Sequence, residues 1–593
     1  MNPHVSKRIE FFLISLLTFF SFLILFVLRG IDDNRLISWL WTFSSVNITG
    51  FSLIIILGII FAYIFTRRSF PKFSPSVFLF LLSFISVMPF WRAPEVIVDA
   101  SRYFTQAKHL DVYGIGYFLK EWGRDIVAWT DLPLIPFLYG LIFKLFGESR
   151  AYIQIFTTFL FSMTVVLTYL IGKELWDEDV GFYGGLLLLG IPYLFTQVPL
   201  MLVDVPAMFF LTFAIYTFIK ALKRGGSWIP LASFAIFLVF YAKYSAWLML
   251  SVLGVIFLVY LIKNRGLGEE GSLRIPSPSR GEGEGGGVNS ELLTPNYIHR
   301  GALIVSIAAL LMGIVFWYKF DVFSEQLRLL ISYQKPGLRR WEESFISTFF
   351  FQIHPFITVS ALYSVYAAFK KKDLKYAIIV WLVLLVVMLG IKRIRYIIMV
   401  FPMLTLMASY GLKGARDKAI KRFVASCIIV SSIAIAMFAY LPFLQRMSVA
   451  NLKEAGHFLN TLTEEDVVVF TLLQEDAVVN PAVDVSILDL YTDKRIYFEY
   501  HAAFVPPREA IERSPLRFTW EYKNPAYYEN RNGPDKYAVV LISSETGSAL
   551  PGHAVGKAAD FHPTRVFSIS EGVFQHKTFV TVYQADNRVH KSF

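Results

Sequence analysis

The stretch FFLISLLTFFSFLILFVL, from Phe11 to Leu28, decides the fold, because it contains no charged side chain over its whole length. A helix that crosses a bilayer needs about 20 predominantly apolar residues. No small-residue cleavage site follows the stretch, so we expect a retained transmembrane helix rather than a removed signal peptide. Similar stretches recur through the chain.

These stretches together predict a polytopic α-helical membrane protein with about 13 transmembrane helices. The predicted spans are 11–28, 50–66, 76–91, 151–171, 180–197, 204–221, 229–244, 245–262, 301–319, 345–368, 375–391, 395–412 and 421–442. The composition agrees, since 55% of the residues are hydrophobic and only 17% are charged. Soluble globular domains carry roughly 25% charged residues.

The net charge of +11 would suggest nucleic-acid binding in a soluble protein, but the placement of the basic residues argues against it. They cluster between apolar stretches, which is the pattern of cytoplasmic loops. The clusters are Lys7 and Arg8; Arg67, Arg68 and Lys72; Lys220, Lys223 and Arg224; Lys370 to Lys372 with Lys375; and Lys413 to Arg422. With a cytoplasmic N-terminus, alternate crossing places all five clusters inside, and an odd number of spans places the C-terminal region outside. We therefore expect a multi-pass protein of the plasma (inner) membrane.

Three regions outside the spans differ in character. The segment 92–150 is the longest loop between spans of the membrane core, and such loops are usually functional. Its apolar part, 132–146, is short and contains two prolines, so we expect an amphipathic helix in the outer interface. A Pro-, Ser-, Gly- and Glu-rich stretch at 264–299 predicts a disordered cytoplasmic insertion.

The sequence predicts three domains. Residues 1–75 hold two N-terminal transmembrane helices, and 76–444 form the main transmembrane domain. Residues 445–593 have soluble character, with a helical pattern after Asn451 and strand patterns such as DVVVF and YAVVLIS. We expect a small extracytoplasmic α/β domain there, which supports the enzyme or docks an acceptor rather than performing catalysis.

The first external loop gathers most of the side chains that could carry chemistry. Its carboxylates and basic groups are suited to proton transfer, and its aromatic rings to stacking against sugars. An alternative is that a wet loop beside a membrane is naturally polar, with Trp and Tyr at the interface. The titratable residues are Glu95, Asp99, Arg102, Tyr103, His109, Asp111, Glu121, Arg124, Asp125 and Asp131.

Five motifs, in order, resemble those of the integral-membrane C-type glycosyltransferases (GT-C). The similarity is to the branch of protein mannosyltransferases and lipid A aminoarabinose transferases, which is glycosyltransferase family 39-like. The motifs are Asp99-Ala-Ser-Arg-Tyr103, DLPLIPFLYGLIFKLFGES from Asp131 to Ser149, GIPYLFTQVPLMLVDVPA with Pro192 and Asp204, Tyr241-Ala-Lys243-Tyr244, and Arg395-Tyr396-Ile-Ile-Met-Val-Phe-Pro402. The match covers roughly residues 76–445 and leaves out the two N-terminal helices and the C-terminal domain.

The chain departs from the family pattern at three points. Ala100 stands where a second acid is frequent, and one proline is missing after Tyr396. The WWDYG signature of oligosaccharyltransferases is absent, which argues against that branch. Even so, the resemblance implies a GT-C-like fold and the transfer of a sugar from a polyprenyl-phosphate donor to an acceptor hydroxyl, with inversion at the anomeric carbon.

The resemblance and the charges together predict the site. Asp99 is the expected general base and Asp204 a second catalytic acid, although Asp204 could instead cap its helix. The predicted substrate-binding residues are Arg102, Tyr103, Lys243, Arg395 and Tyr396. Lys243 could bind phosphate or extend to the interface.

Other positions are open at this stage. Lys392, Arg393 and Arg395 lie on the outer side against the charge rule, which suggests an anionic ligand such as a lipid phosphate. His354 could cap a helix. No metal-ligand spacing is present, so a divalent metal remains a possibility without assigned ligands.

The expected partners are a polyprenyl-phosphate-linked sugar, membrane lipids, and a lipid, glycan or protein acceptor. One rival interpretation is a transporter or flippase of lipid-linked glycans, but we find no internal repeat and no charges at the bilayer midplane. Another is a membrane anchor without catalytic activity. The lack of a Gly-rich nucleotide-binding motif is consistent with a lipid-linked donor.

Overall fold

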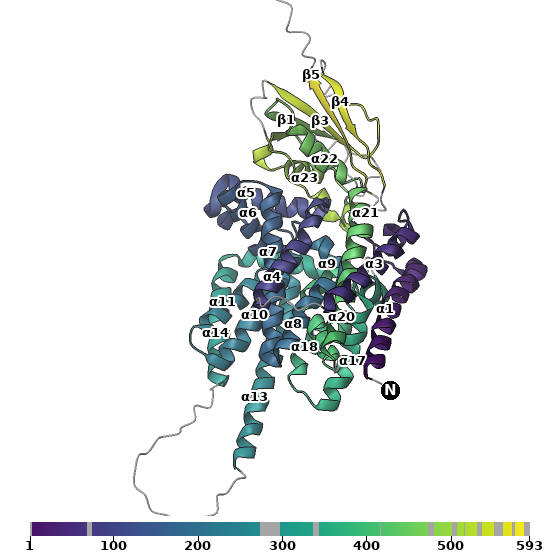
Figure 1. Cartoon of the computed structure of the whole chain (residues 1–593). Coiled ribbons are helices and arrows are strands. Elements are labelled where there is room, and N and C mark those ends of the chain that lie inside the picture. Colours follow the sequence, from purple (N-terminus) through teal and green to yellow (C-terminus); the bar gives the residue numbers. More distant parts are fainter. Residues whose placement is uncertain are drawn as a thin grey trace, which may run out of the picture.

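The computed structural model describes residues 3–67, 74–272, 297–335, 343–414, 417–472, 479–500, 507–514, 516–529, 536–550, 561–571 and 576–585. Most of the predicted insertion at 264–299 therefore lies outside the described residues. A tall helical region carries the C-terminal domain at one end, and the N-terminus and the end of α13 (Ser251–Ser272) lie at the other (Figure 1).

The predicted membrane class is confirmed. Within the ranges given above, nine helical segments are long and apolar enough to cross a membrane. They are Lys7–Ile31, Ile48–Arg67, Pro75–Arg92, Arg150–Leu175, Asp204–Arg224, Tyr244–Lys263, Tyr297–Tyr318, Ile394–Leu412 and Lys418–Gln445. Shorter apolar helices are Leu134–Phe146, Trp228–Phe240 and Tyr376–Met388. The count of 13 spans stays a prediction.

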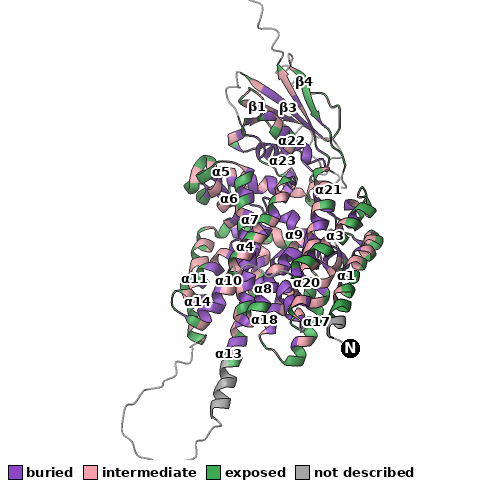
Figure 2. Cartoon of the chain, viewed as in Figure 1, coloured by how far each residue is buried: buried purple, intermediate pink, exposed green. Residues whose placement is uncertain are grey.

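The centre of the helical region is the most buried part of the chain (Figure 2). It contains α7 (Arg150–Leu175), α8 (Glu178–Leu187), α10 (Asp204–Arg224) and α19 (Phe401–Leu412), which pack against one another. Around it lie α4 (Pro75–Val87), η2 (Met88–Arg92), α11 (Trp228–Phe240), α12 (Tyr244–Met249), α14 (Tyr297–Tyr318), α15 (Phe320–Leu329), η4 (Leu330–Gln334), η6 (Ser347–Gln352), α17 (Pro355–Lys371), α18 (Tyr376–Met388) and η7 (Ile394–Val400).

The first helix pair, α1 (Pro3–Val27) and α3 (Ile48–Arg67), packs beside α20 (Lys418–Ile435). The connection between the pair contains η1 (Leu28–Ile31) and α2 (Trp39–Thr42). After α20 the chain continues through η8 (Ala436–Tyr440) and α21 (Leu441–Gln445) toward the C-terminal domain.

Two predicted spans are broken. Residues 345–368 form η6 and α17, with extended backbone at Ile353 and His354 between them. Residues 180–197 form α8, η3 (Leu188–Gly190) and the short helix α9 (Pro192–Gln197) rather than one helix. Pro192 has no backbone N–H and disfavours helical backbone at Ile191, whose φ and ψ are extended. Thr196 and Gln197, in α9, line a cavity beside the C-terminal domain.

The long loop at residues 92–150 is largely helical. Helix α5 (Ile97–Glu121) contains a kink at Gly114, where φ is 86°, and it packs on α6 (Leu134–Phe146). The contact depends on Gly140, because a Cβ there would lie 2.7 Å from the carbonyl oxygen of Ala107. Helix α6 matches the apolar stretch predicted at 132–146, while α5 is an element that the apolar pattern does not reveal.

The C-terminal domain is an α/β unit with a five-stranded sheet in the order β2-β1-β3-β5-β4. Its strands are β1 (Asp466–Thr471), β2 (Arg495–Phe498), β3 (Tyr537–Ser543), β4 (Phe561–Phe567) and β5 (Phe579–Ala585). Strand β1 is parallel to β2 and β3, while β5 is antiparallel to β3 and β4. Its helices are α22 (Ala450–Leu459), α23 (Ala482–Asp489), α24 (Arg508–Arg513), α25 (Arg517–Trp520) and η9 (Ala526–Tyr528).

Candidate active site between the helical region and the C-terminal domain

A cavity of about 1,600 Å³ lies between the helical region and the C-terminal domain. Its wall includes the α1–α3 connection, the start of α5, the Lys243 turn and the segment before α19. Leu516, Phe518 and His576 of the C-terminal domain also line it. All five predicted substrate-binding residues and Asp99 belong to the wall, so the fold gathers side chains that are far apart in sequence.

Arg395 connects the two predicted catalytic acids. Its Nε donates to Asp204 at 2.8 Å, and its Nη1 donates to Asp99. Lys243 donates to the other oxygen of Asp204. Asp204 is only 1% exposed and lies behind the two cations rather than on the cavity wall. Its carboxylate binds side chains and does not cap α10, so the capping alternative is wrong.

The cavity face of α5 carries a second ion-pair group. Asp99, Arg102, Tyr103 and Gln106 follow the i, i+3, i+4, i+7 spacing that places side chains on one helix face. Arg102 Nε lies 2.6 Å from Asp131 and Arg102 Nη2 lies 3.6 Å from Asp99. Gln106 also donates to Asp131, at 3.2 Å. Arg102 thus joins Asp131 to the proposed base.

The electrostatics of Asp99 depend on these cations. Burial raises the pKa of its carboxyl, but the charges of Arg395 and Arg102 outweigh this and hold the pKa below its usual range. The pKa of Asp131 is raised, because burial and the nearby charge of Asp99 outweigh its contact with Arg102. Asp99 is therefore ionised but weakly basic while Arg395 stays on it.

Aromatic side chains complete this part of the wall. The ring of Tyr396 lies 5.8 Å from the Lys243 ammonium, and Tyr103 is 3% exposed beside Arg102. Trp129 has φ 50°, a left-handed backbone that bulky residues rarely adopt. Its ring packs against Tyr333 and Phe518, which hold this strained position.

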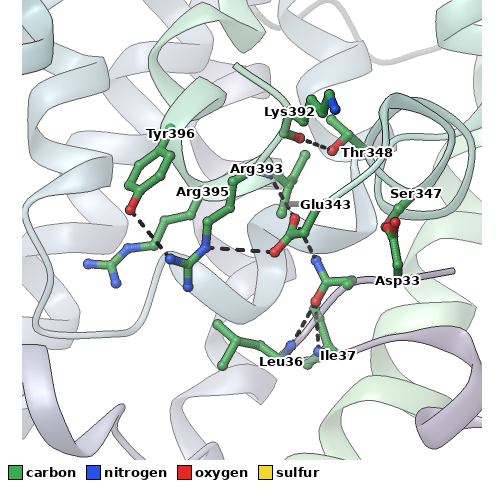
Figure 3. Close-up of polar contacts among 12 residues, drawn as sticks. Asp33, Leu36, Ile37, Glu343, Ser347, Thr348, Lys392, Arg393, Arg395 and Tyr396 are labelled. Atoms are coloured by element: carbon green, nitrogen blue, oxygen red, sulfur yellow. Dashed lines mark hydrogen bonds and ion pairs between the residues drawn. The ribbon is translucent and has the colours of Figure 1, made fainter. Parts of the chain in front are cut away.

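A carboxylate that sequence reasoning missed lies in the same wall. Glu343 accepts from the amide of Ile394 at 3.2 Å and from Asn34 at 3.4 Å, and it lies 3.7 Å from Arg393 (Figure 3). Burial raises its pKa to about 7, against the opposing charge of Arg393. Glu343 thus connects the α1–α3 connection to the segment that carries Arg395. Its sequence context, an acid among Arg and Trp between spans, gives no specific signal.

The α1–α3 connection is fixed by further polar contacts. Asp33 accepts from the amide and hydroxyl of Ser344, and Asp32 accepts from Gln352 at 3.1 Å and from the amide of Trp39 at 2.6 Å. Asn34 accepts from the amides of Leu36 and Ile37, as the lower part of Figure 3 shows. The connection between the first two helices, which lies outside the family resemblance, therefore forms part of the cavity wall.

Other candidates from the first loop have different surroundings. Glu95 is buried against Arg150 at 2.7 Å and accepts from the amide of Met201. His109 contacts its own helix through the carbonyl of Thr105, and His354 caps α17 by accepting from Phe356. Six of these candidates do not line the cavity: Asp111, Glu121, Arg124, Asp125, His109 and His354.

No metal can be assigned from the geometry. Among the residues that the structure describes, no group of three or more His, Cys, Asp or Glu side chains is arranged to hold an ion. Of the carboxylates that line the cavity, Glu95, Asp99, Asp131 and Glu343 are already paired with arginines, whereas Asp32 and Asp33 accept hydrogen bonds from Gln352 and Ser344. Metal dependence stays open.

Comparisons with known proteins agree with this architecture. Residues 131–270 match the family model described as dolichyl-phosphate-mannose-protein mannosyltransferase. No curated protein matches the chain. Among solved structures, ArnT from Cupriavidus metallidurans bound to undecaprenyl phosphate is similar, with a TM-score of 0.52 and 11% identity over 85% of this chain and 97% of that one. Its apo state gives the same values.

A second similarity is weaker. The archaeal oligosaccharyltransferase AglB from Archaeoglobus fulgidus, in complex with an inhibitory peptide and a dolichol-phosphate, has a TM-score of 0.43 and 11% identity over 79% of this chain and 69% of that one. The ArnT comparison is the one that establishes the fold, since it covers nearly the whole of both chains. The chain is therefore an integral-membrane protein with the GT-C fold, that of the C-type glycosyltransferases.

Proposed function

We propose that the protein transfers a sugar from a polyprenyl-phosphate donor to an acceptor hydroxyl at the extracytoplasmic membrane surface. The observation that carries the proposal is the ion-paired group of Arg395, Lys243 and Asp99 on the wall of one large cavity, with the buried Asp204 behind them. Two cations suit a lipid phosphate, and a carboxylate beside them suits an acceptor hydroxyl. The matched family and the undecaprenyl phosphate bound to ArnT agree with such a donor.

The reaction is a single displacement. The acceptor oxygen attacks the anomeric carbon, the bond from that carbon to the phosphate oxygen breaks, and the lipid phosphate leaves with the electron pair. Asp99 takes the proton of the acceptor hydroxyl. Arg395 and Lys243 stabilise the charge that develops on the leaving phosphate. Inversion at the anomeric carbon follows from one attack on the face opposite the phosphate.

Donor binding and base activation are linked in this scheme. Arg395 is shared between Asp99 and Asp204. A phosphate that takes over part of its hydrogen bonding withdraws positive charge from Asp99, and the pKa of Asp99 then rises toward its ordinary value. The base thereby gains proton affinity only when a leaving group is in place.

The test uses the full chain in vesicles that contain a polyprenyl-phosphate sugar. Mass spectrometry of lipid-linked and acceptor glycans should show a glycosylated product and free polyprenyl phosphate in equal amounts. Movement of intact donor across the bilayer without product would instead indicate a transporter, and the proposal would be wrong. A comparison of surface glycans from cells with and without the protein then identifies the sugar and acceptor.

A further inference from the structure

Helix α5 is held from two sides. Its cavity face carries Asp99 and Arg102, while Thr105 and Lys108 contact Ser486 and Asp489 of the C-terminal domain. Helix α23 of that domain packs against α5, and Figure 1 shows the domain seated on the α5–α6 end of the helical region. The domain therefore touches the helix that presents the proposed base.

The contact is polar, short and shielded from water. Lys108 Nζ lies 2.6 Å from Asp489 and 2.9 Å from Glu148, which follows the end of α6. Asp489 is 2% exposed and also accepts from Tyr528 at 2.6 Å. One turn earlier on α5, the hydroxyl of Thr105 lies 3.0 Å from that of Ser486. Separating Lys108 from Asp489 would leave a buried carboxylate without its cation, which is costly, so the pair fixes the position of α5.

A second contact holds the chain just before α5. The hydroxyl of Tyr491 accepts from the amide of Glu95 at 2.9 Å, and its ring lies 5.3 Å from the guanidinium of Arg150. Arg150 in turn binds the Glu95 carboxylate. Both the entry to α5 and its middle are thus tied to residues 486–491 of the C-terminal domain.

We infer that the C-terminal domain positions α5, with Ser486 and Asp489 holding Thr105 and Lys108 so that Asp99 stays in place against Arg395. The importance of this positioning for catalysis rests on the proposed role of Asp99 as the general base. Lys108 and Asp489 are positioning residues that touch no substrate. Small displacements of a reacting group can cost about 10²-fold in rate, so a loosened α5 lowers turnover.

The first experiment needs no substrate. Hydrogen–deuterium exchange is measured on the purified full chain for wild type, Lys108→Met, Asp489→Asn and the double variant. We expect faster exchange in α5 for both single variants, with the double variant close to the more affected single one, because both remove the same pair. Arg495→Met is the matched control, since it removes an exposed 3.6 Å pair with Asp466 elsewhere in the same domain. Unchanged α5 exchange in all variants would overturn the inference.

Two variants of Thr105, which change no charge, serve as a control for misfolding of the Lys108 and Asp489 variants. Thr105→Val removes the hydroxyl that meets Ser486, whereas Thr105→Ser keeps it. Faster α5 exchange in the valine variant but not in the serine variant supports the positioning role, and equal exchange in both contradicts it.

The second experiment connects the contact to transfer. We expect Asp489→Asn to lower kcat about tenfold with the donor KM unchanged, since Arg395 and Lys243 lie on other segments. A raised KM with unchanged kcat would overturn the inference. If wild type transfers no sugar yet α5 exchange responds as described, the proposed function fails while the positioning of α5 by the domain stands.

Discussion

Arg395 and Asp204 form a buried ion pair, with 2.8 Å between Nε and Oδ2, although 190 residues separate them in the chain. The same guanidinium also binds Asp99. The cation proposed for the donor phosphate is thus paired with two carboxylates. In the proposed reaction, the donor phosphate therefore replaces a carboxylate as a partner of Arg395. The two carboxylates stabilise the guanidinium charge in the cavity.

Asp99→Asn should lower the rate of sugar transfer without weakening donor binding. The amide keeps the shape of the side chain but cannot take a proton, so transfer should fall by about 10²–10⁴-fold. Arg395 loses a negative partner, so donor affinity should be equal to or higher than that of wild type. Rates and donor affinity are measured in vesicles, with Tm as the check on folding. A correctly inserted variant with full activity would remove Asp99 as the base, and Glu95 and Asp131, which also line the cavity, would be tested next.

Asp204→Asn is the matched control for that variant. Because Asp204 lies behind Lys243 and Arg395, its loss should disturb the position of both cations and leave the base intact. We expect a smaller loss of kcat than for Asp99→Asn. An equal or larger loss would mean that Asp204 takes part in proton transfer.

Arg395→Ala should raise the apparent donor KM, with a loss of about 1.5–3 kcal/mol of charge-assisted contact. Arg395→Lys should recover part of it, since the charge remains without the planar fork. In Arg395→Ala, Asp99 and Asp204 also lose a positively charged partner. Removing one member of a buried ion pair typically costs about 3–5 kcal/mol in stability.

The double variant Arg395→Ala with Asp204→Asn therefore serves as the control for folding. It should regain Tm relative to Arg395→Ala but not donor affinity. If Arg395→Ala and Arg395→Lys both match wild type across donor concentrations, the phosphate binds elsewhere.

How far the sequence predicts this molecule depends on the kind of signal. Long apolar stretches reveal the membrane class, because a bilayer leaves few alternatives to a spanning helix. Strands β1, β2, β3 and β5 are present where the sequence shows strand patterns. Strand β4 (FHPTRVF) is not recognisable in the sequence, since it contains a proline and little apolar alternation. Helix α5 is hidden because its helical period is carried by polar residues.

The site shows the same division. The motifs supplied the candidates Asp99, Asp204, Lys243 and Arg395, and the structure brings them together. Their pairing could not be predicted, since nothing in a sequence states which carboxylate a distant arginine meets. Asn34 and Glu343 were missed for the same reason, because their contact joins residues 309 positions apart.

Gly140→Ala tests the close approach of α6 to α5. A Cβ at this position would lie 2.7 Å from both the Ala107 oxygen and the Leu110 Cβ, so the helices must separate. We expect a stability loss of about 1–3 kcal/mol, seen as a lower Tm in detergent. Gly116→Ala is the control, because nothing lies within 4 Å of the added Cβ. Equal Tm values for both variants would contradict the close packing.

The topology prediction gains a structural argument. Lys7 pairs with Asp417, and Lys413 with Asp177, each at 2.6 Å, so basic clusters from distant segments lie together. We predict that this end is cytoplasmic and that the C-terminal domain is outside. In a Cys427→Ser background, an impermeant thiol reagent on intact cells should label Glu545→Cys but not Arg280→Cys. The opposite labelling would reverse the orientation.

Glu343 should make the stability of the protein depend on pH. Its pKa is raised from 4.5 to about 7 by burial, so the folded state holds a proton that the unfolded state has lost between these values. The stabilisation is therefore fully present below about pH 4.5 and is lost as pH rises through 7, by at most on the order of 3 kcal/mol. Tm should fall between about pH 5 and pH 8.

Glu343→Gln isolates this contribution, because glutamine resembles the protonated carboxyl at every pH. Its Tm should vary less over the same range and should equal or exceed that of wild type at about pH 8. Asp32, whose pKa burial raises to about 6, faces the same segment and is tested separately as Asp32→Asn. The prediction fails if wild type and Glu343→Gln show parallel Tm profiles, which would mean that Glu343 is ionised throughout and bound to Arg393.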